Sequence, residues 1–151
     1  MRIKTIFSAA LVFVMAFALL AFAQGDKEND IKLHKNCKHC NMDREKFNFS
    51  RMLIEYEDGT SVGLCSIHCA AVELNRNKGK KVRSLLVADY TTKKLTDART
   101  ATWVIGGKQQ GVMTSVAKWA FIKAEDAKKF VRENGGKIAT FDEAMRAAKD
   151  E

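Results

Sequence analysis

The sequence predicts an α+β fold in which the order strand, strand, helix, strand occurs twice and one more helix follows. Short segments with alternating apolar and polar residues, bounded by turn residues, predict the strands. Two longer segments with apolar residues three and four positions apart predict the helices between them. A capping signal near the end of the chain predicts the last helix.

The first half of the repeat runs from residue 51 to residue 88. Asp58-Gly59 favours a tight hairpin, and the segments on either side of it have the composition of strands. The following helix has an apolar stripe at helical spacing, with Ser66 as its predicted N-cap. The predicted elements are, in order, strand 51–56, strand 60–65, helix 67–77 and strand 82–88.

The second half runs from residue 100 to residue 140. Gly135-Gly136 predicts a left-handed stop for its helix, and Thr140-Phe141-Asp142-Glu143 predicts a capping box for the last helix. Where the first half has a tight hairpin, this half has an irregular loop over 107–115, and long loops in compact domains often carry function. The predicted elements are strand 100–105, strand 118–122, helix 125–134 and strand 137–140.

Residues 1–23 are typical of a cleaved signal peptide. Arg2 and Lys4 precede an apolar run that ends in Ala21-Phe22-Ala23, a small-residue cleavage pattern. A retained transmembrane anchor is the alternative, because the run is just long enough to span a bilayer. Cleavage predicts an exported, periplasmic protein without a stable membrane anchor. Residues 24–36 are expected to form a flexible lead-in to a single domain over 37–151.

The net charge of the full chain is +8, and much of the excess lies in the basic run 76–83. Such a run is typical of a solvated loop and also suits contact with an acidic partner. Nucleic acid is not expected as a partner, because an exported protein rarely meets it and the chain has no recognised binding motif.

All four cysteines lie in two close pairs, Cys37-x-x-Cys40 and Cys65-x-x-x-Cys69. The second pair lies at the predicted helix start, where unpaired amides and the helix dipole favour the thiolate form that binds metal. Imidazole and thioether side chains accompany the thiols, and such ligands suit Cu(I) and Zn(II). The candidate metal ligands are Cys37, Cys40, Met42, Cys65, His68, Cys69 and, from the irregular loop, Met113.

The residues leave more than one interpretation open. Cu(I) favours two or three soft donors, so thiolates and thioethers can hold it while one side stays open for transfer. A structural Zn(II) site needs four protein ligands that fill the coordination shell, and the four cysteines can supply them. Such a site leaves Met42 and Met113 without a role. Disulfides are a further alternative in an exported protein.

A thiol-disulfide redox protein is the remaining alternative for the pair at Cys37. Oxidoreductases of the thioredoxin kind place such a pair after a strand and at the start of a helix. Here the pair follows a polar segment, and no other catalytic constellation is present in the sequence. We therefore do not expect an enzyme.

A series of short motifs follows the chain from the first cysteine pair to the last helix. In order they are Cys37-x-x-Cys40-x-Met42, Asp58-Gly59, Cys65-Ser66-x-x-Cys69, Asp89-Tyr90-Thr91-Thr92, Asp97-Ala98, Trp103-Val104-Ile105-Gly106, Gly111-x-Met113, Gly135-Gly136 and Phe141-Asp142-Glu143. In this series the chain resembles the NosL family, exported copper-binding accessory proteins of nitrous oxide reductase and their relatives.

The resemblance implies a two-lobed fold, with one strand-strand-helix-strand unit in each lobe. It also implies Cu(I) held by sulfur, with Cys37 and Cys40 as thiols and Met42 and Met113 as thioethers. We expect these four to be the primary donors and Cys65, His68 and Cys69 to form a second set. The implied function is a metallochaperone that delivers copper by ligand exchange, and the implied partner is a client copper protein, such as nitrous oxide reductase, or a copper exporter.

Three positions depart from the family's pattern. Gln24 stands where many relatives have a lipid-bearing cysteine, Asn41 stands where glycine precedes the first methionine, and Val112 replaces a proline before Met113. The first departure bears on membrane anchoring, and the other two bear on the geometry of the metal-binding loops.

Overall fold

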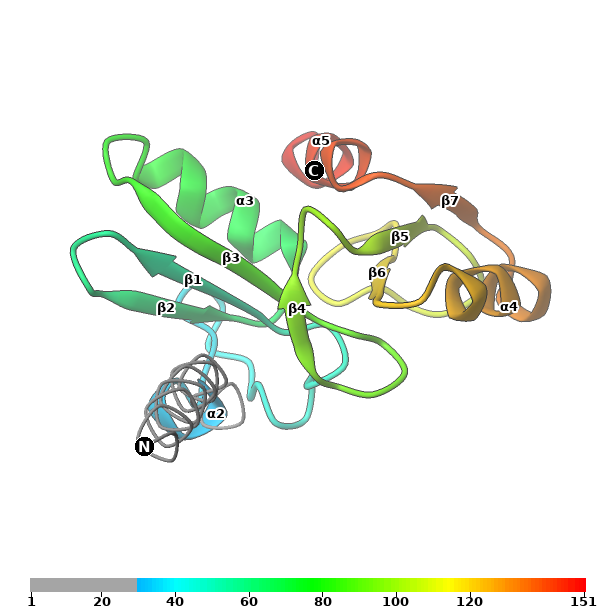
Figure 1. Ribbon diagram of the computed structural model, residues 1–151, viewed down its shortest axis with the longest axis horizontal. Coiled ribbons are helices and arrows are strands. Elements are labelled where there is room, and N and C mark those ends of the chain that lie inside the picture. Colours follow the sequence, from blue (N-terminus) through cyan, green and yellow to red (C-terminus); the bar gives the residue numbers. More distant parts are fainter. Residues whose placement is uncertain (1–29) are drawn as a thin grey trace, which may run out of the picture.

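Two antiparallel sheets, one after the other along the chain, form the framework of the molecule (Figure 1). The structure is a computed structural model and describes residues 30–151. The expected signal peptide and residues 24–29 of the expected lead-in lie outside the described residues. Within the described range, the helices lack the combination of length and hydropathy needed to cross a bilayer.

The first sheet contains the first predicted repeat. Its elements are β1 (Met52–Tyr56), β2 (Ser61–Leu64), α3 (Ile67–Arg76), β3 (Val82–Ala88) and β4 (Leu95–Asp97). The strand order is β2-β1-β3-β4, and every neighbouring pair is antiparallel. Helix α3 leads from β2 to β3 and packs against β1 and β2. The first lobe is therefore a sheet with α3 along one face.

The second sheet contains the second predicted repeat. Its elements, with the last helix, are β5 (Thr102–Ile105), β6 (Lys118–Phe121), α4 (Ala124–Asn134), β7 (Lys137–Ala139) and α5 (Phe141–Lys149). The strand order is β6-β5-β7, again antiparallel. Helix α4 packs against this sheet, whereas α5 packs against both β5 and α3. Helix α5 thus connects the two lobes.

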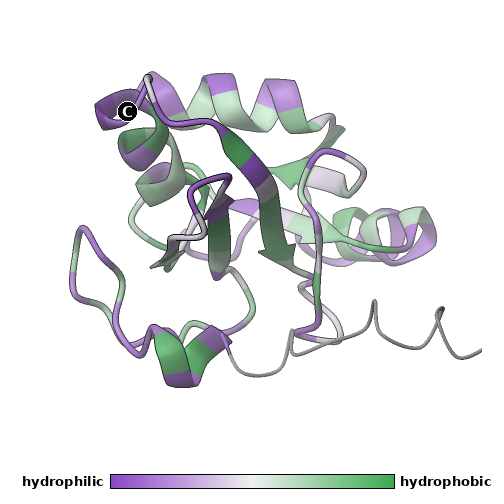
Figure 2. Ribbon diagram, turned by 60° about the vertical axis from the view of Figure 1, so that its left-hand side comes forward, coloured by the Kyte–Doolittle hydropathy of each residue, from purple (hydrophilic) through white to green (hydrophobic). Residues whose placement is uncertain are grey.

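One hydrophobic core runs through both lobes. It includes Ile54 of β1, Trp103 of β5 and Met145 of α5 among its buried residues. Figure 2 shows that α3, the long helix along the top, keeps hydrophilic residues on its outward side and hydrophobic residues toward the strands. This distribution is what an amphipathic helix needs in order to bury its apolar face against a sheet. The two lobes therefore share a core.

Asp89 and Tyr90 join the two sheets. The buried Asp89 carboxylate accepts a hydrogen bond from the amide of Ile122 at 2.8 Å, and the Tyr90 amide donates to the Ala120 carbonyl at 2.8 Å. The Tyr90 ring packs on Trp119 with a centroid separation of 5.2 Å. The Asp89-Tyr90-Thr91-Thr92 motif of the sequence is thus a structural junction.

The structure confirms the α+β class, the repeated element order and the final helix. The predicted capping box is present, because the Thr140 side chain accepts from the Glu143 amide and the Glu143 side chain accepts from the Thr140 amide. Ser66 lies at the N-cap of α3, as predicted, but its side chain makes no capping hydrogen bond. Strand β4 was not predicted, since three residues are too short to show an alternating pattern.

Residues 30–36 differ from the flexible lead-in expected there. They begin with the short helix α2 (Asp30–Leu33), and Asp30 is only 2% exposed. Its carboxylate forms ion pairs with Arg44 at 2.6 Å and with Arg51 at 3.0 Å. The sequence did not reveal this contact, because a buried ion pair between distant positions leaves no periodic pattern in a polar sequence.

The fully buried Arg44 guanidinium holds this segment against the first sheet. Besides its bond to Asp30, it donates to the carbonyls of His34 at 2.6 Å, Met52 at 3.0 Å and Leu64 at 3.1 Å. A buried charge is tolerated only when such partners replace its lost hydration. Arg44 therefore fixes the chain before the first cysteine pair onto both β1 and β2.

We predict that Asp30→Asn destabilises the protein by about 3–5 kcal/mol, because two buried arginines lose their countercharge. Thermal or urea unfolding of the purified protein measures this loss. The control is Glu125→Gln, which breaks the exposed ion pair with Lys128 and should leave the midpoint almost unchanged. Equal effects of the two substitutions would contradict a structural role for Asp30.

Candidate metal centre

The first cysteine pair lies in a tight turn that we call the knuckle, residues 36–43. Its ends are joined by a bridge between Asn36 and Asp43. Inside it, the Cys37 amide donates to the Met42 carbonyl at 2.8 Å, and the Asn41 amide donates to the Cys37 carbonyl at 2.9 Å. These bonds close the turn around the Cys37-x-x-Cys40 sequence.

The turn needs a left-handed backbone at Asn41, whose φ is +59°. Glycine adopts this conformation without steric cost, and asparagine tolerates it better than most other residues. The Asn41 side chain also accepts a hydrogen bond from the Asn36 amide group at 3.0 Å. The replacement of the family's glycine by asparagine is therefore compatible with the same turn.

Gly63 of β2 allows the knuckle to lie close to the sheet. The Lys38 amide donates to the Gly63 carbonyl at 3.1 Å. A Cβ atom at this position would stand 2.3 Å from the Cβ of His34 and 2.7 Å from Cζ of Arg44, closer than packed atoms can approach. Only glycine leaves room here for His34 and Arg44, which flank the knuckle on either side in the sequence.

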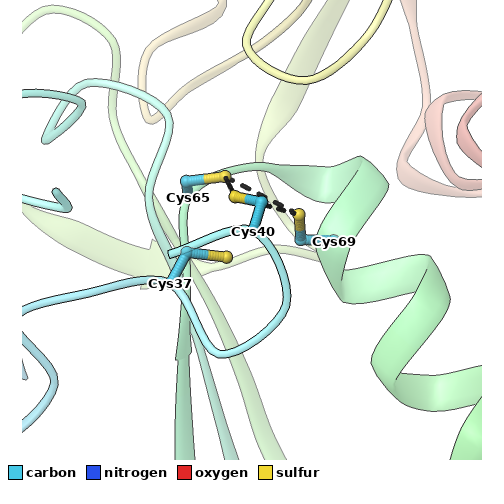
Figure 3. Close-up of side chains that lie close together, drawn as sticks. All are labelled: Cys37, Cys40, Cys65 and Cys69. Atoms are coloured by element: carbon cyan, nitrogen blue, oxygen red, sulfur yellow. Dashed lines mark hydrogen bonds between the residues drawn. The ribbon is translucent and has the colours of Figure 1, made fainter. Parts of the chain in front are cut away.

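Four sulfur atoms meet where the knuckle reaches α3 (Figure 3). Cys37 and Cys40 come from the knuckle, Cys65 precedes α3, and Cys69 lies in its first turn. The Sγ atoms of Cys40 and Cys65 are 3.3 Å apart, those of Cys65 and Cys69 are 3.7 Å apart, and those of Cys69 and Cys40 are 3.9 Å apart. All four lie within 4.8 Å of one another.

These separations match the size of a tetrahedral site. Metal-sulfur bonds of about 2.3 Å, as in zinc sites, place tetrahedral ligands about 3.8 Å from each other. All four cysteines are free thiols in the structure. The four sulfurs therefore lie close enough together to share one ion.

Burial and contact between the thiols shift the pKa values of three of the cysteines in different directions. Cys37, Cys65 and Cys69 are buried, whereas Cys40 is half-buried at the rim. The adjacent Cys65 and Cys69 thiols lower the pKa of Cys37 well below that of a free thiol. Their contact with Cys37, together with burial, raises the pKa of Cys65 and of Cys69. A cation that binds all four must displace the protons of the last two.

His68 does not belong to the four-sulfur cluster. Its side chain lines a cavity of about 560 Å³ between α3 and the end of α5, together with Ala71 and Ala148. Its Nδ1 atom is buried without a hydrogen-bond partner among the described residues. The structure thus places this predicted ligand in a different environment from the neighbouring Cys69.

The two predicted thioether ligands are held differently. Met42 closes the knuckle and packs, partly buried, against the core. Met113 is 43% exposed and has a left-handed φ of +55° in the loop between β5 and β6. In Figures 1 and 3 this loop extends toward the start of α3. The structure therefore leaves Met113 accessible to solvent in a loop that approaches the cysteines.

Glu151 holds the part of the β5–β6 loop that follows Met113. Its carboxylate accepts hydrogen bonds from the Ser115 hydroxyl and the Val116 amide, each at 3.2 Å, and forms an ion pair with Lys118 at 3.2 Å. The Lys118 side chain is itself buried and also donates to the Val116 carbonyl at 2.8 Å. Residues 114–118 are thus fixed next to the exposed Met113.

The sequence did not predict a role for Glu73 of α3. This buried carboxylate is 2.7 Å from Nε2 of His39 in the knuckle and accepts a hydrogen bond from the Tyr56 hydroxyl at 3.0 Å. A glutamate on an amphipathic helix is ordinarily solvent-exposed, so no local pattern marks this one as buried.

Comparison with known proteins supplies the family. The NosL family model matches residues 28–148. The chain belongs to the NosL family. The match begins before the first cysteine pair and ends within α5, so it includes both lobes and the whole four-sulfur cluster. No curated protein sequence matches this chain at a significant level.

A solved structure has a similar fold. It is the crystal structure of the copper chaperone NosL from Shewanella denitrificans, with a TM-score of 0.57 and 23% sequence identity. The similarity covers 72% of this chain and 87% of that chain. At this identity the comparison establishes the two-lobed α+β architecture of the NosL-family chain.

We predict that metal affinity rises with pH, because bound metal displaces thiol protons. Each displaced proton adds about one log unit of affinity per pH unit, so Cys65 and Cys69 together contribute about two to the slope. Competition titrations with Zn(II) between about pH 6 and pH 8 measure this slope. The variant Cys69→Ser removes one proton and should lower the slope by about one. An unchanged slope would show that Cys69 does not lose a proton on binding.

Proposed function

We propose that this protein is a copper chaperone that holds Cu(I) on the four-sulfur cluster and passes it to a client copper protein. The observation that carries the proposal is the convergence of all four cysteines within 4.8 Å, in a chain that belongs to the NosL family. Thiolates are the soft donors that Cu(I) prefers.

The unequal burial of the sulfurs suits release by ligand exchange. Cu(I) favours two or three soft donors, so a cluster of four always offers a spare thiol. Cys40 stands at the rim, while Cys65 and Cys69 are buried at the start of α3. A thiol or thioether from a client can therefore approach from the Cys40 side and replace the knuckle sulfurs first.

In this proposal the methionines are additional donors that take part in the transfer of the copper ion. Met113 is exposed in the β5–β6 loop, and Glu151 holds the residues that follow it. Its thioether can therefore bind an ion before the cysteines bind it or after they release it. Met42, partly buried at the end of the knuckle, serves as a further soft donor. His68 lies in its separate cavity and takes no part in the four-sulfur cluster of this scheme.

The client and the cellular location are part of the proposal. A signal peptide at residues 1–23 sends the chain to the periplasm, where it acts without a stable membrane anchor. Nitrous oxide reductase is the proposed client, and a copper exporter is the proposed source or alternative partner. Both follow from the resemblance in sequence to the NosL family.

A structural zinc site is the second candidate. The sulfur separations, close to those of a tetrahedral four-thiolate site, favour it. In that case zinc stabilises the contact between knuckle and helix, and the protein acts as an interaction module. Methionines have no role in such a site, so they distinguish the two candidates.

We predict that the reduced protein retains Cu(I) against a competing chelator and in the presence of excess Zn(II). The double variant Met42→Leu/Met113→Leu should weaken Cu(I) binding about tenfold or more and leave Zn(II) binding unchanged. The control Met145→Leu alters a buried methionine of α5 and should change neither. Tight binding of Zn(II) with only weak binding of Cu(I) would support the structural zinc site instead.

A further inference from the structure

His39 occupies the centre of the knuckle, between the two cysteines, yet its ring faces α3. Its Nε2 atom is 2.7 Å from Oε2 of Glu73, and both side chains are largely buried, with exposed fractions of 12% and 7%. On its other side, Nδ1 of His39 lies 3.5 Å from a guanidinium nitrogen of Arg76. The imidazole is therefore held by the helix that also carries Cys69.

The Glu73 carboxylate is itself fixed. Its other oxygen accepts hydrogen bonds from the Tyr56 hydroxyl and from the Asn77 amide group, each at 3.0 Å. Burial and the bond to Glu73 raise the pKa of Tyr56 above that of a free phenol, so the hydroxyl stays protonated and continues to donate. The carboxylate cannot turn away from His39 without the loss of these contacts to β1 and α3.

This contact lies between the two halves of the metal centre. The knuckle carries Cys37 and Cys40, whereas Cys65 and Cys69 lie at the start of α3. The position of one pair relative to the other depends on how firmly the knuckle is held. The Lys38 amide bond to Gly63 holds it against β2, and the His39–Glu73 pair holds it against α3.

We propose that His39 and Glu73 form a latch that positions the knuckle cysteines over α3 and limits the rate of metal release. The proposal rests on the proposed function, in which an ion is bound by the four thiols. Neither residue is a metal ligand in this scheme; both are positioning residues. Release requires the knuckle to swing away with Cys37 and Cys40, and the His39–Glu73 hydrogen bond must break before it can do so.

The test measures release from the loaded, reduced protein by rapid mixing with excess chelator, bathocuproine disulfonate for Cu(I) and pyridylazoresorcinol for Zn(II). The variants are His39→Ala, Glu73→Gln and the double variant. A hydrogen bond to a buried carboxylate is among the stronger kinds, so each single substitution should speed release about tenfold. The double variant should release no faster than the faster single variant, because both remove the same contact.

Thr140→Ala is the control for general stability. It removes the capping box of α5 and lowers the unfolding midpoint, but it leaves the Glu73 carboxylate and its contact with His39 in place. Its release rate should stay within about twofold of the unaltered protein. Faster release in this control, equal to that of Glu73→Gln, would show that general loss of stability and not the latch sets the rate.

The outcomes separate the latch from the copper proposal. Release at the unaltered rate from His39→Ala and Glu73→Gln, or effects that multiply in the double variant, would overturn the latch even if Cu(I) binds tightly. Faster release of Zn(II) from both variants, in a protein that binds Cu(I) only weakly, would support the latch and overturn the copper chaperone.

Discussion

The buried guanidinium of Arg44 is the constraint around which the metal-binding half of the molecule is arranged. A charge without contact to water must find its full set of partners inside the protein, and Arg44 finds them on α2, β1 and β2. The need to satisfy this one side chain fixes where the chain enters the fold. It also explains Gly63, because a side chain at this position would overlap the guanidinium.

The two cysteine pairs differ in how they are supported. Cys65 and Cys69 are held by the hydrogen bonds of α3 and by the core on which the helix packs. Cys37 and Cys40 depend on a turn of eight residues and on its contacts with Gly63 and Glu73. Local stability differs across a fold, and here the weaker support lies on the side where we propose that ligands are exchanged. A rigid pair and a releasable pair are a suitable arrangement for an ion that is bound and then transferred.

Local signals in the sequence were sufficient to predict most of the fold. The hairpin at Asp58-Gly59, the stripe on α3 and the capping box at Thr140 each depend on residues within one or two turns of each other. The spacing of Cys65 and Cys69 predicts a common face, because residues four apart on a helix are neighbours. The same geometry turns His68 about 100° away from Cys69, toward α5, so its separate location follows from helical periodicity.

The interactions that the sequence did not reveal join residues that are far apart. Asp30 and Arg44, and likewise His39 and Glu73, are single polar residues on different elements, and nothing near either one identifies its partner. The four cysteines were expected to bind metal, but their assignment to one cluster or two required the position of the knuckle over α3. Such placements depend on tertiary packing, which overrides local preference.

A single cluster of cysteine sulfurs is the proposed copper site of this protein. X-ray absorption at the copper edge, on the reduced protein loaded with one equivalent of Cu(I), reports the ligand atoms directly. We expect a ligand shell of sulfur alone, which is lost in the variant Cys37→Ser/Cys40→Ser. A shell with nitrogen neighbours and the scattering pattern of an imidazole ring, retained in that variant, would place the ion on a histidine outside the cluster and overturn the four-sulfur site.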